Sequence, residues 1–253
     1  MNDEAGNSLP TLNVDGMVGT IMLRRPDVAN RLSQNDIDEL IKFIDQVNGS
    51  NVLVLRIFST GNYFCSGYNI GQMESGKSSG FDALTNALED CRPVTIAALQ
   101  GGVYGGGTDL ALACDFRVGT PNVEMFMPAA RLGLHFYQRG LERYVSRLGL
   151  NTAKQLLLTA EKIPAEKMLA TGFLTHLVDP EELSNEVNAL TDVLADMAPL
   201  SLLGMKKHLN RIARNVVDTD ELQLDIVKAR QSADLIEGRN AWREKRKPKF
   251  TGV

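Results

Sequence analysis

Short apolar runs separated by turn residues mark the strands that the sequence predicts. Residues 11–14 and 19–23 flank Asp15-Gly16, which is typical of a strand–turn–strand hairpin. Two further apolar runs, residues 52–58 and 94–99, have the length and composition of buried strands. The first half of the chain is therefore expected to build a sheet.

Apolar residues at helical spacing predict the helices between and after these strands. The best example follows Ser33, a good helix cap, with apolar residues at positions 37, 40, 41, 44 and 47. A second helix is expected over residues 81–91, and a third after the glycine-rich stretch 101–107, capped by Thr108 or Asp109. Beyond Pro180, helices are expected to residue 197, over 200–214 and over 220–237. Alternation of strand, glycine-bearing loop and helix is typical of the α/β class.

Composition narrows the class of protein. The chain has 253 residues, 43% of them hydrophobic and 23% charged, as in ordinary globular proteins. Its net charge of −4 argues against general nucleic-acid binding, and no apolar run is long enough to span a membrane. The polar N-terminus is unlike a signal peptide. Cys65, Cys91 and Cys114 are widely spaced, so we expect reduced thiols in a cytoplasmic protein without a metal site.

Three adjacent glycines, Gly105-Gly106-Gly107, precede the third helix. Glycines at a helix start leave backbone amides uncovered at the positive end of the helix dipole, which suits an anion. A phosphate loop would need a lysine after the glycines, and a dinucleotide fingerprint would need spaced glycines; neither is present. The remaining interpretation is an oxyanion hole, which stabilises charge developing on a carbonyl oxygen and needs a second amide from elsewhere.

Several motifs in a fixed order resemble the crotonase, or enoyl-CoA hydratase/isomerase, superfamily. They are residues 63–70 (YFCSGYNI), 101–107 (GGVYGGG), 110–117 (LALACDFR), 128–133 (PAARLG), 156–159 (LLLT), 165–178 and 237–252. Together they extend over nearly the whole chain. Each motif alone is weak, whereas their order and spacing together are highly specific.

The resemblance implies a fold and a division of the chain. The expected fold is a crotonase-like spiral of ββα units over residues 11–195, preceded by a flexible tail at 1–10. A C-terminal helical region, residues 196–253, is expected to pack against neighbouring subunits. Members of the family are usually trimers or dimers of trimers.

The resemblance also supplies the second amide of the oxyanion hole. One donor is expected from Tyr68, after the glycine of the first loop, and the other from Gly106, with Gly107 as the alternative one residue later. The two amides would polarise the carbonyl of an acyl-CoA thioester and stabilise an enolate.

This sequence departs from the family at the two glutamates that manage water in enoyl-CoA hydratases. The position after the glycine triplet is Asp109, which has a shorter reach, and the position after Pro128 is Ala129, which carries no proton. A carboxylate in the first turn of a helix also has a purely structural use. A two-glutamate hydration mechanism is therefore not expected.

Substitute chemistry is expected from the loop after Gly133. By resemblance, Tyr137 occupies the position at which dienoyl-CoA isomerases carry an aspartate, and His135 lies two residues earlier. Both can exchange or donate protons. The alternative is an aromatic cluster that lines an acyl pocket.

Coenzyme A recognition is carried over from the family by position. Val28 and Asn30, in the loop after the hairpin, and Ser66, Tyr68 and Asn69, in the first glycine-bearing loop, are expected to bind the nucleotide portion, with Gly107 beside the thioester. Lys249 and Phe250 of the basic tail are expected to reach the phosphates, either within the same subunit or from a neighbouring one. Coenzyme A enters as part of the substrate, and no separate cofactor is expected.

The sequence thus predicts an acyl-CoA enzyme that stabilises a thioester enolate, an atypical enoyl-CoA hydratase or isomerase. A decarboxylase of the same superfamily and a non-catalytic acyl-CoA-binding subunit remain as alternatives.

Overall fold

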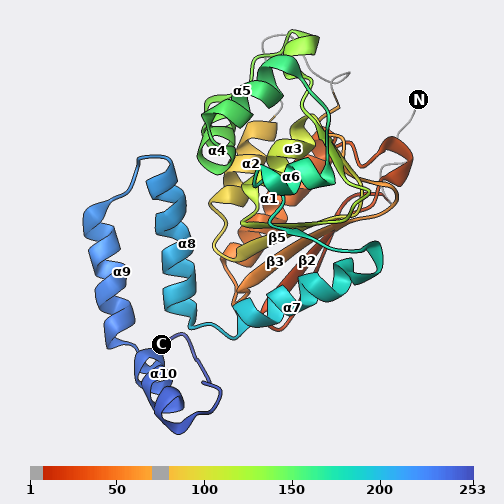
Figure 1. Cartoon of the computed structure of the whole chain (residues 1–253). Coiled ribbons are helices and arrows are strands. Elements are labelled where there is room, and N and C mark those ends of the chain that lie inside the picture. Colours follow the sequence, from red (N-terminus) through yellow and green to blue (C-terminus); the bar gives the residue numbers. More distant parts are fainter. Residues whose placement is uncertain (1–7, 70–79) are drawn as a thin grey trace.

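The computed structural model describes residues 8–69 and 80–253, and a six-stranded sheet forms its base (Figure 1). The strands of this sheet, in spatial order, are β1 (Thr11–Asp15), β2 (Val18–Leu23), β3 (Val54–Ser59), β5 (Val94–Leu99), β7 (Phe116–Gly119) and β10 (His176–Leu177). The β1–β2 hairpin is antiparallel, and every later pairing is parallel. The predicted hairpin and both predicted buried strands are thereby confirmed.

The chain passes repeatedly from the first sheet into a second, four-stranded sheet. Its order is β4 (Tyr63–Cys65), β6 (Gly102–Tyr104), β8 (Glu124–Phe126) and β9 (Ile163–Pro164). Each of β3, β5 and β7 is followed directly by a strand of this second sheet, and β4 and β6 lead on to helices. Repetition of this unit produces the expected ββα spiral.

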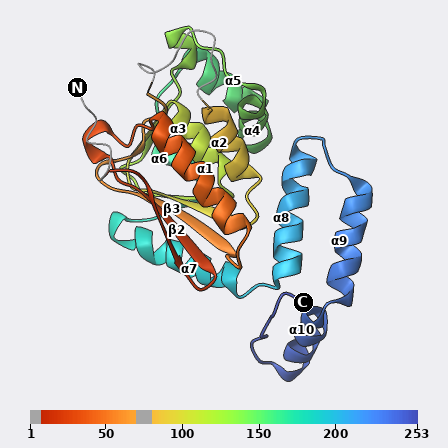
Figure 2. The same ribbon diagram turned by 180° about the vertical axis from the view of Figure 1, so that it is seen from behind.

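Helices cover both faces of the larger sheet (Figures 1 and 2). On one side lie α1 (Gln34–Asn48), α2 (Phe81–Glu89), α3 (Gly106–Ala113), α4 (Gln138–Leu148), α5 (Leu150–Thr159) and α6 (Ala165–Ala170), and on the other α7 (Leu183–Ala195). Short 3₁₀ turns occur at η1 (Pro26–Val28), η3 (Ala129–Leu132) and η4 (Pro180–Glu182). The main apolar core joins the sheets to α1, α2 and α3, and a second core joins β3 and β5 to α7.

The cap of α1 shows how sequence sets an element boundary. The Ser33 hydroxyl oxygen accepts from the amide of Asp36, and the Asp36 carboxylate accepts from the amide of Ser33. This reciprocal capping box satisfies amides that lack partners in the first turn. Ile37, Leu40, Ile44 and Val47 are all buried, which confirms the predicted apolar face.

The C-terminal helices form an arm that extends away from the sheets. It consists of α8 (Pro199–Ala213), α9 (Thr219–Gln231) and α10 (Ala233–Glu244) (Figure 1). The single helix expected over residues 220–237 is wrong, because Ser232 leaves the helical conformation and caps α10 with its hydroxyl. After α10 the chain folds back, and Asp234 accepts from the amides of Thr251 and Gly252.

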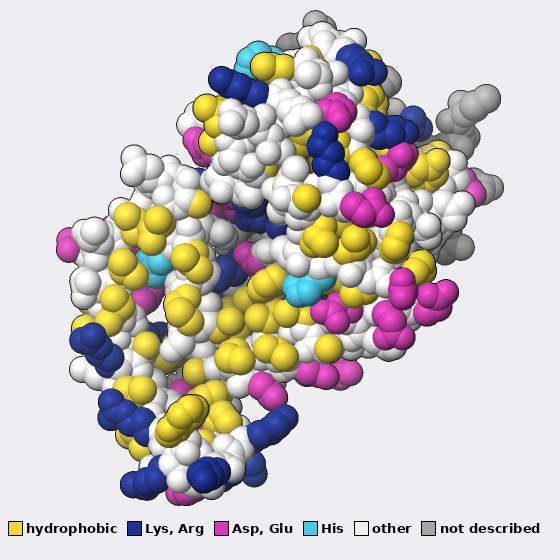
Figure 3. All heavy atoms as spheres, viewed as in Figure 1, with side chains coloured by type: hydrophobic (Ala, Val, Ile, Leu, Met, Phe, Trp, Pro, Cys, Tyr) yellow, Lys and Arg dark blue, Asp and Glu magenta, His cyan; other side chains and the backbone are white. Residues whose placement is uncertain are grey.

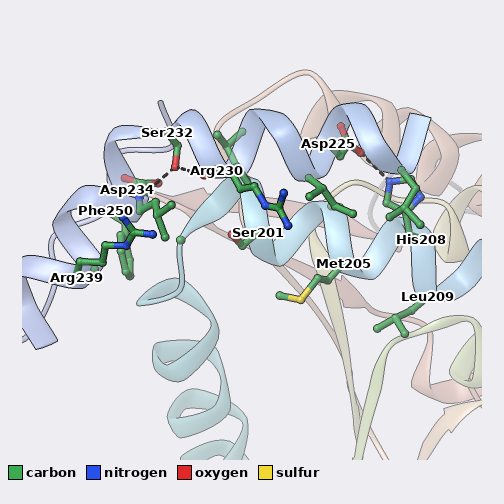
Figure 4. A pocket seen from close by; sticks show the side chains of 18 of the residues that line it. Ser201, Met205, His208, Leu209, Asp225, Arg230, Ser232, Asp234, Arg239 and Phe250 are labelled. Atoms are coloured by element: carbon green, nitrogen blue, oxygen red, sulfur yellow. Dashed lines mark hydrogen bonds and ion pairs between the residues drawn. The ribbon is translucent and has the colours of Figure 1, made fainter. Parts of the chain in front are cut away.

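Apolar side chains gather on the arm and line a groove between its three helices (Figures 3 and 4). The groove has a volume of about 890 Å³ and is lined by Met205, Leu209 and Phe250 among others. His208 lies at one end, where its Nε2 is 2.8 Å from a carboxylate oxygen of Asp225. Across residues 8–69 and 80–253, no helix has the length and apolar character needed to cross a membrane.

Candidate active site

Two loops from different turns of the spiral meet at Gly67 and Gly106. A Cβ atom added to Gly67 would lie 2.5 Å from the amide nitrogen of Gly106, and Gly67 has a φ of +87°. Both the contact and the left-handed backbone require glycine at this position. A Cβ on Gly107 would lie 2.2 Å from the carbonyl oxygen of Cys65, so the glycine triplet lies directly against the first loop.

The hydrogen bonds that hold the first loop in place do not use the amide of Tyr68. A parallel bridge joins Leu32 to Tyr68. In this bridge the amide of Leu32 donates to Gly67 at 2.8 Å, and the amide of Asn69 donates to Leu32 at 2.9 Å. This pattern uses the backbone groups of the residues on either side of Tyr68 and does not engage the Tyr68 N–H.

The second amide belongs to the first residue of α3. The helix begins at Gly106, with Gly105 as its cap at φ +51°. The expected cap at Thr108 or Asp109 is therefore wrong, because the glycines themselves start the helix; the Thr108 hydroxyl donates to the carbonyl of Gly105 instead. An N–H in the first turn has no partner within its helix, so Gly106 presents a donor beside the loop of Tyr68.

Aromatic and hydroxyl side chains surround the Gly106 amide. The Phe81 ring covers Gly106 so closely that an added Cβ would lie 2.7 Å from it. One helical turn later, the Thr85 hydroxyl is 3.1 Å from the hydroxyl of Tyr137. Phe81 and Thr85 of α2 thus bring Tyr137 to the same region as Gly106.

Asp109 lies one turn after Gly106 and is completely buried. Its two carboxylate oxygens accept from Nε and Nη2 of Arg143, at 2.8 and 2.6 Å, and one of them also accepts from the Tyr137 hydroxyl. Burial, followed by the neighbouring Asp109 carboxylate, raises the pKa of Tyr137. Asp109 thus reaches the site through Tyr137, and its own catalytic role stays a prediction.

Arg143, which sequence reasoning missed, belongs to a larger ionic cluster. Burial alone would lower the pKa of Arg143, but contacts with Asp109 and Glu89 outweigh burial and raise it. Glu89, at the end of α2, lies within 3.1 Å of Arg143 and 2.5 Å of Arg139. Arginines at positions 139, 143 and 147, four residues apart, place three cations on one helix face; that spacing was the available signal.

Ala129 and His135 do not join this cluster in the described contacts. Ala129 begins η3 and packs partly buried against the core. His135 is exposed, and its Nδ1 lies 2.7 Å from the carbonyl oxygen of Phe136. The Phe136 ring stacks on Tyr137 with centroids 4.6 Å apart. A role for His135 in the reaction remains a prediction.

The loops expected to bind the nucleotide portion lie side by side. The amide of Ser66 donates to the carbonyl of Ala29 at 3.0 Å, close to Val28. The Asn30 side chain is buried and fully used, since it accepts from the amide of Arg25 and donates to the carbonyls of Thr60 and Tyr63. Asn30 therefore shapes the loop, and any coenzyme contact there falls to backbone groups and neighbours.

Lys249 and Phe250 lie on the arm. The Lys249 amide donates to Glu237, and Phe250 packs beside Gly238 of α10. No contact among the described residues joins them to the loops of Val28 or Ser66. A shared coenzyme site would need Lys249 and Phe250 from a second copy of the chain.

The cysteine thiols are buried, and the backbone of Cys65 lies against Gly107. Cys65, Cys91 and Cys114 are free and buried, and burial raises the pKa of each thiol to about 12. Within the part of the chain that the structure describes, no group of three or more His, Cys, Asp or Glu side chains is arranged to hold a metal ion.

The spiral and the paired amides define a protein of the crotonase fold, and comparisons with known proteins agree. A solved enoyl-CoA hydratase from Bacillus anthracis superposes with a TM-score of 0.86 at 24% identity, over 96% of this chain and 99% of that one. The Enoyl-CoA hydratase/isomerase family model matches residues 13–253. The chain belongs to this family of enzymes.

Two curated relatives cover most of the chain. A short-chain-enoyl-CoA hydratase from Clostridium acetobutylicum is 29% identical over 217 residues, which are 82% of this chain and 83% of that protein. A methylmalonyl-CoA decarboxylase from Escherichia coli is 27% identical over 235 residues, 88% of this chain and 90% of that one. The family therefore includes relatives with different reactions at similar distances.

Proposed function

We propose that the enzyme binds an acyl-CoA thioester and stabilises its enolate with the amides of Tyr68 and Gly106. The close approach of Gly67 to Gly106 carries this proposal, because it sets two donors from separate loops beside each other. Fixed donors aimed at a developing oxyanion supply a large part of such catalysis, and loss of one typically costs about 2.7–4 kcal/mol.

Within the family, an atypical reaction with a single proton carrier fits the site best. Hydration by two carboxylates lacks one partner at Ala129, and Asp109 is engaged by Arg143. Double-bond isomerisation needs one group that removes a proton from one carbon and returns it to another. We assign this role to Tyr137, whose hydroxyl donates to Asp109.

Decarboxylation of a malonyl-type thioester is the second candidate. Loss of CO₂ leaves the bonding electron pair in the enolate, so the step needs no base. Full engagement of Asp109 by Arg143 and Tyr137 favours a reaction of this kind, and one relative is named a methylmalonyl-CoA decarboxylase.

One panel separates these chemistries. A 2-enoyl, a 3-enoyl and a malonyl-type CoA thioester are incubated with the enzyme in D₂O and followed by NMR. Isomerisation moves the double bond and places deuterium at the α- or γ-carbon, and decarboxylation releases CO₂ with one deuterium at the α-carbon. Binding of all three thioesters with no turnover would contradict the proposal and indicate an acyl-CoA-binding subunit.

We further propose that the functional unit is a homotrimer or a dimer of trimers. The apolar groove of the arm and the position of Lys249 and Phe250 on it support an arrangement in which the tail of one copy serves the nucleotide loops of another. Deletion of residues 245–253 is then expected to weaken CoA binding in a salt-dependent way.

A further inference from the structure

The hydrogen bond from Tyr137 to Asp109 has a direction that limits what each group can do. Asp109 also accepts two hydrogen bonds from the Arg143 guanidinium. The Tyr137 hydroxyl donates to the same carboxylate, so its hydrogen points at Asp109. The oxygen of Tyr137 is then left with lone pairs, and Thr85 lies 3.1 Å away on one side.

Exposure differs between the two members of this pair. Asp109 is 0% exposed and cannot touch a ligand, whereas Tyr137 is half-buried. Gly106 begins the helix turn that carries Asp109, and the Phe81 ring that covers Gly106 lies one turn before Thr85. Gly106 and Tyr137 therefore contact α2 one helical turn apart, at Phe81 and Thr85.

We propose that Tyr137 and Asp109 form a proton relay, and that Arg143 is the positioning residue that holds Asp109 in hydrogen-bonding register with Tyr137. The inference rests on the proposed enolate function. A substrate C–H bond breaks as an O–H bond forms on Tyr137, while the original Tyr137 proton passes to Asp109. The C–H electron pair enters the enolate held by Tyr68 and Gly106. Reversal returns the proton to the second carbon, so the step is balanced without a further reactant.

The surroundings of Asp109 show why Arg143 is needed. On α4, Arg143 binds Asp109 directly, and the pKa of the nearby Tyr144 is raised by burial first and by the Asp109 carboxylate in addition. From α2, the Thr85 hydroxyl accepts from the same Arg143 guanidinium. Arg143 is the cation in direct contact with Asp109. Arg143 in turn contacts Glu89, which also contacts Arg139, Arg147 and Arg214.

A pair of variants separates this role from mere support of the fold. Arg143→Gln removes the charge that contacts Asp109, whereas Arg139→Gln removes a neighbouring charge of the same helix whose contacts among the described residues are with Glu89 and Asp90. In Arg143→Gln we expect kcat for exchange at the thioester α-carbon to fall at least tenfold while KM stays within about threefold of the wild type, because the reacting groups lose their alignment and the binding loops do not. Both constants are expected to stay near the wild-type values in Arg139→Gln.

A double variant separates loss of the relay from loss of the fold. Asp109→Asn with Arg143→Gln replaces a buried ion pair with two neutral amides, and its fold is checked by CoA-thioester binding within about threefold of the wild type. The relay predicts that exchange in this variant and in Tyr137→Phe falls at least 100-fold. Arg143→Lys, which keeps the charge, is expected to recover part of the Arg143→Gln loss.

The outcomes are distinct from those of the proposed function. Exchange that persists in the folded double variant, or a wild-type kcat in Arg143→Gln, overturns the relay while the enolate function stands. Failure of the wild-type enzyme to exchange any thioester proton overturns both.

Discussion

Glycine residues fix the spacing between the two proposed amide donors. Gly67 and Gly107 each lie against backbone of the opposite loop, at distances that no Cβ atom tolerates. Backbone cannot move aside as the end of a flexible side chain does. The positions of the Tyr68 and Gly106 amides therefore depend on the absence of two methyl groups.

Gly107→Ala tests this dependence. The new Cβ would lie 2.2 Å from the Cys65 carbonyl oxygen, so the loops must separate and turnover is expected to fall at least 100-fold, in line with loss of one oxyanion donor. Gly49→Ala is the matched control, because its φ is −85° and its contacts are ordinary. Thermal unfolding and turnover of both variants are measured; wild-type turnover in Gly107→Ala would refute the close fit.

Helix α4 connects the site to the end of α2 through charge. Arg139 and Arg143 both reach Glu89, which is 4% exposed. A buried ion pair adds little net stability, but removal of one partner leaves the other charge uncompensated. Glu89 thus joins two arginines of α4 to the end of α2.

Glu89→Gln is expected to lower the free energy of unfolding by about 3–5 kcal/mol, since buried arginines lose their shared carboxylate. Chemical denaturation measures this, with Glu39→Gln in the exposed Lys42 pair as the control that stays near wild type. If the free energy of unfolding falls by less than about 1 kcal/mol in Glu89→Gln, the cluster does not stabilise the fold in the way expected here.

The C-terminal tail is attached to α10 by Glu237. Arg246, then the Lys249 amide, hold the pKa of this carboxyl at about 2, below its usual 4.5. Because the pKa of Glu237 is lower in the folded protein than in the unfolded chain, the ionised carboxylate stabilises the attachment at pH values above the unfolded pKa. This stabilisation is lost as the pH falls through the folded pKa of about 2. The protection of the Lys249 amide, its exchange rate relative to an unstructured amide at the same pH, is expected to be lost between about pH 4.5 and 2, and Arg246→Gln should shift the onset upward; protection that does not change with pH would be inconsistent with this anchor.

The elements show which parts of the structure periodicity could predict. The capped, amphipathic α1 and the apolar β5 follow from local pattern, and the hairpin follows from Asp15-Gly16. Helix α4 was not predicted, because the charged residue Arg143 occupies a buried position on its inner face and interrupts the apolar spacing. The meeting of Gly67 with Gly106 is a tertiary contact without a periodic signal, and only the family resemblance pointed to it.

On the scale of the whole molecule, the arm presents apolar surface that a lone chain leaves in water. Leu209 is 65% exposed on α8, Leu224 69% on α9 and Trp242 87% on α10. Contiguous apolar patches on soluble proteins mark interaction sites. The arm is the surface through which we expect subunits to associate.

Leu209→Lys places a charge in that surface and is expected to shift the sedimentation equilibrium toward smaller species. Leu158→Lys on α5 is the control, since Leu158 is similarly exposed, at 72%, but lies away from the arm. Equal oligomer masses for Leu209→Lys and the wild type would contradict association through the arm.

The central claim, that the amides of Tyr68 and Gly106 stabilise a thioester enolate, is tested most directly by NMR of α-carbon deuteration. The enzyme is incubated in D₂O with 3-enoyl-CoA and malonyl-type thioesters, alongside Gly107→Ala. We expect enzyme-dependent deuterium at the α-carbon of at least one thioester, strongly reduced in Gly107→Ala. Thioester binding without deuterium incorporation in the wild-type enzyme would contradict the account.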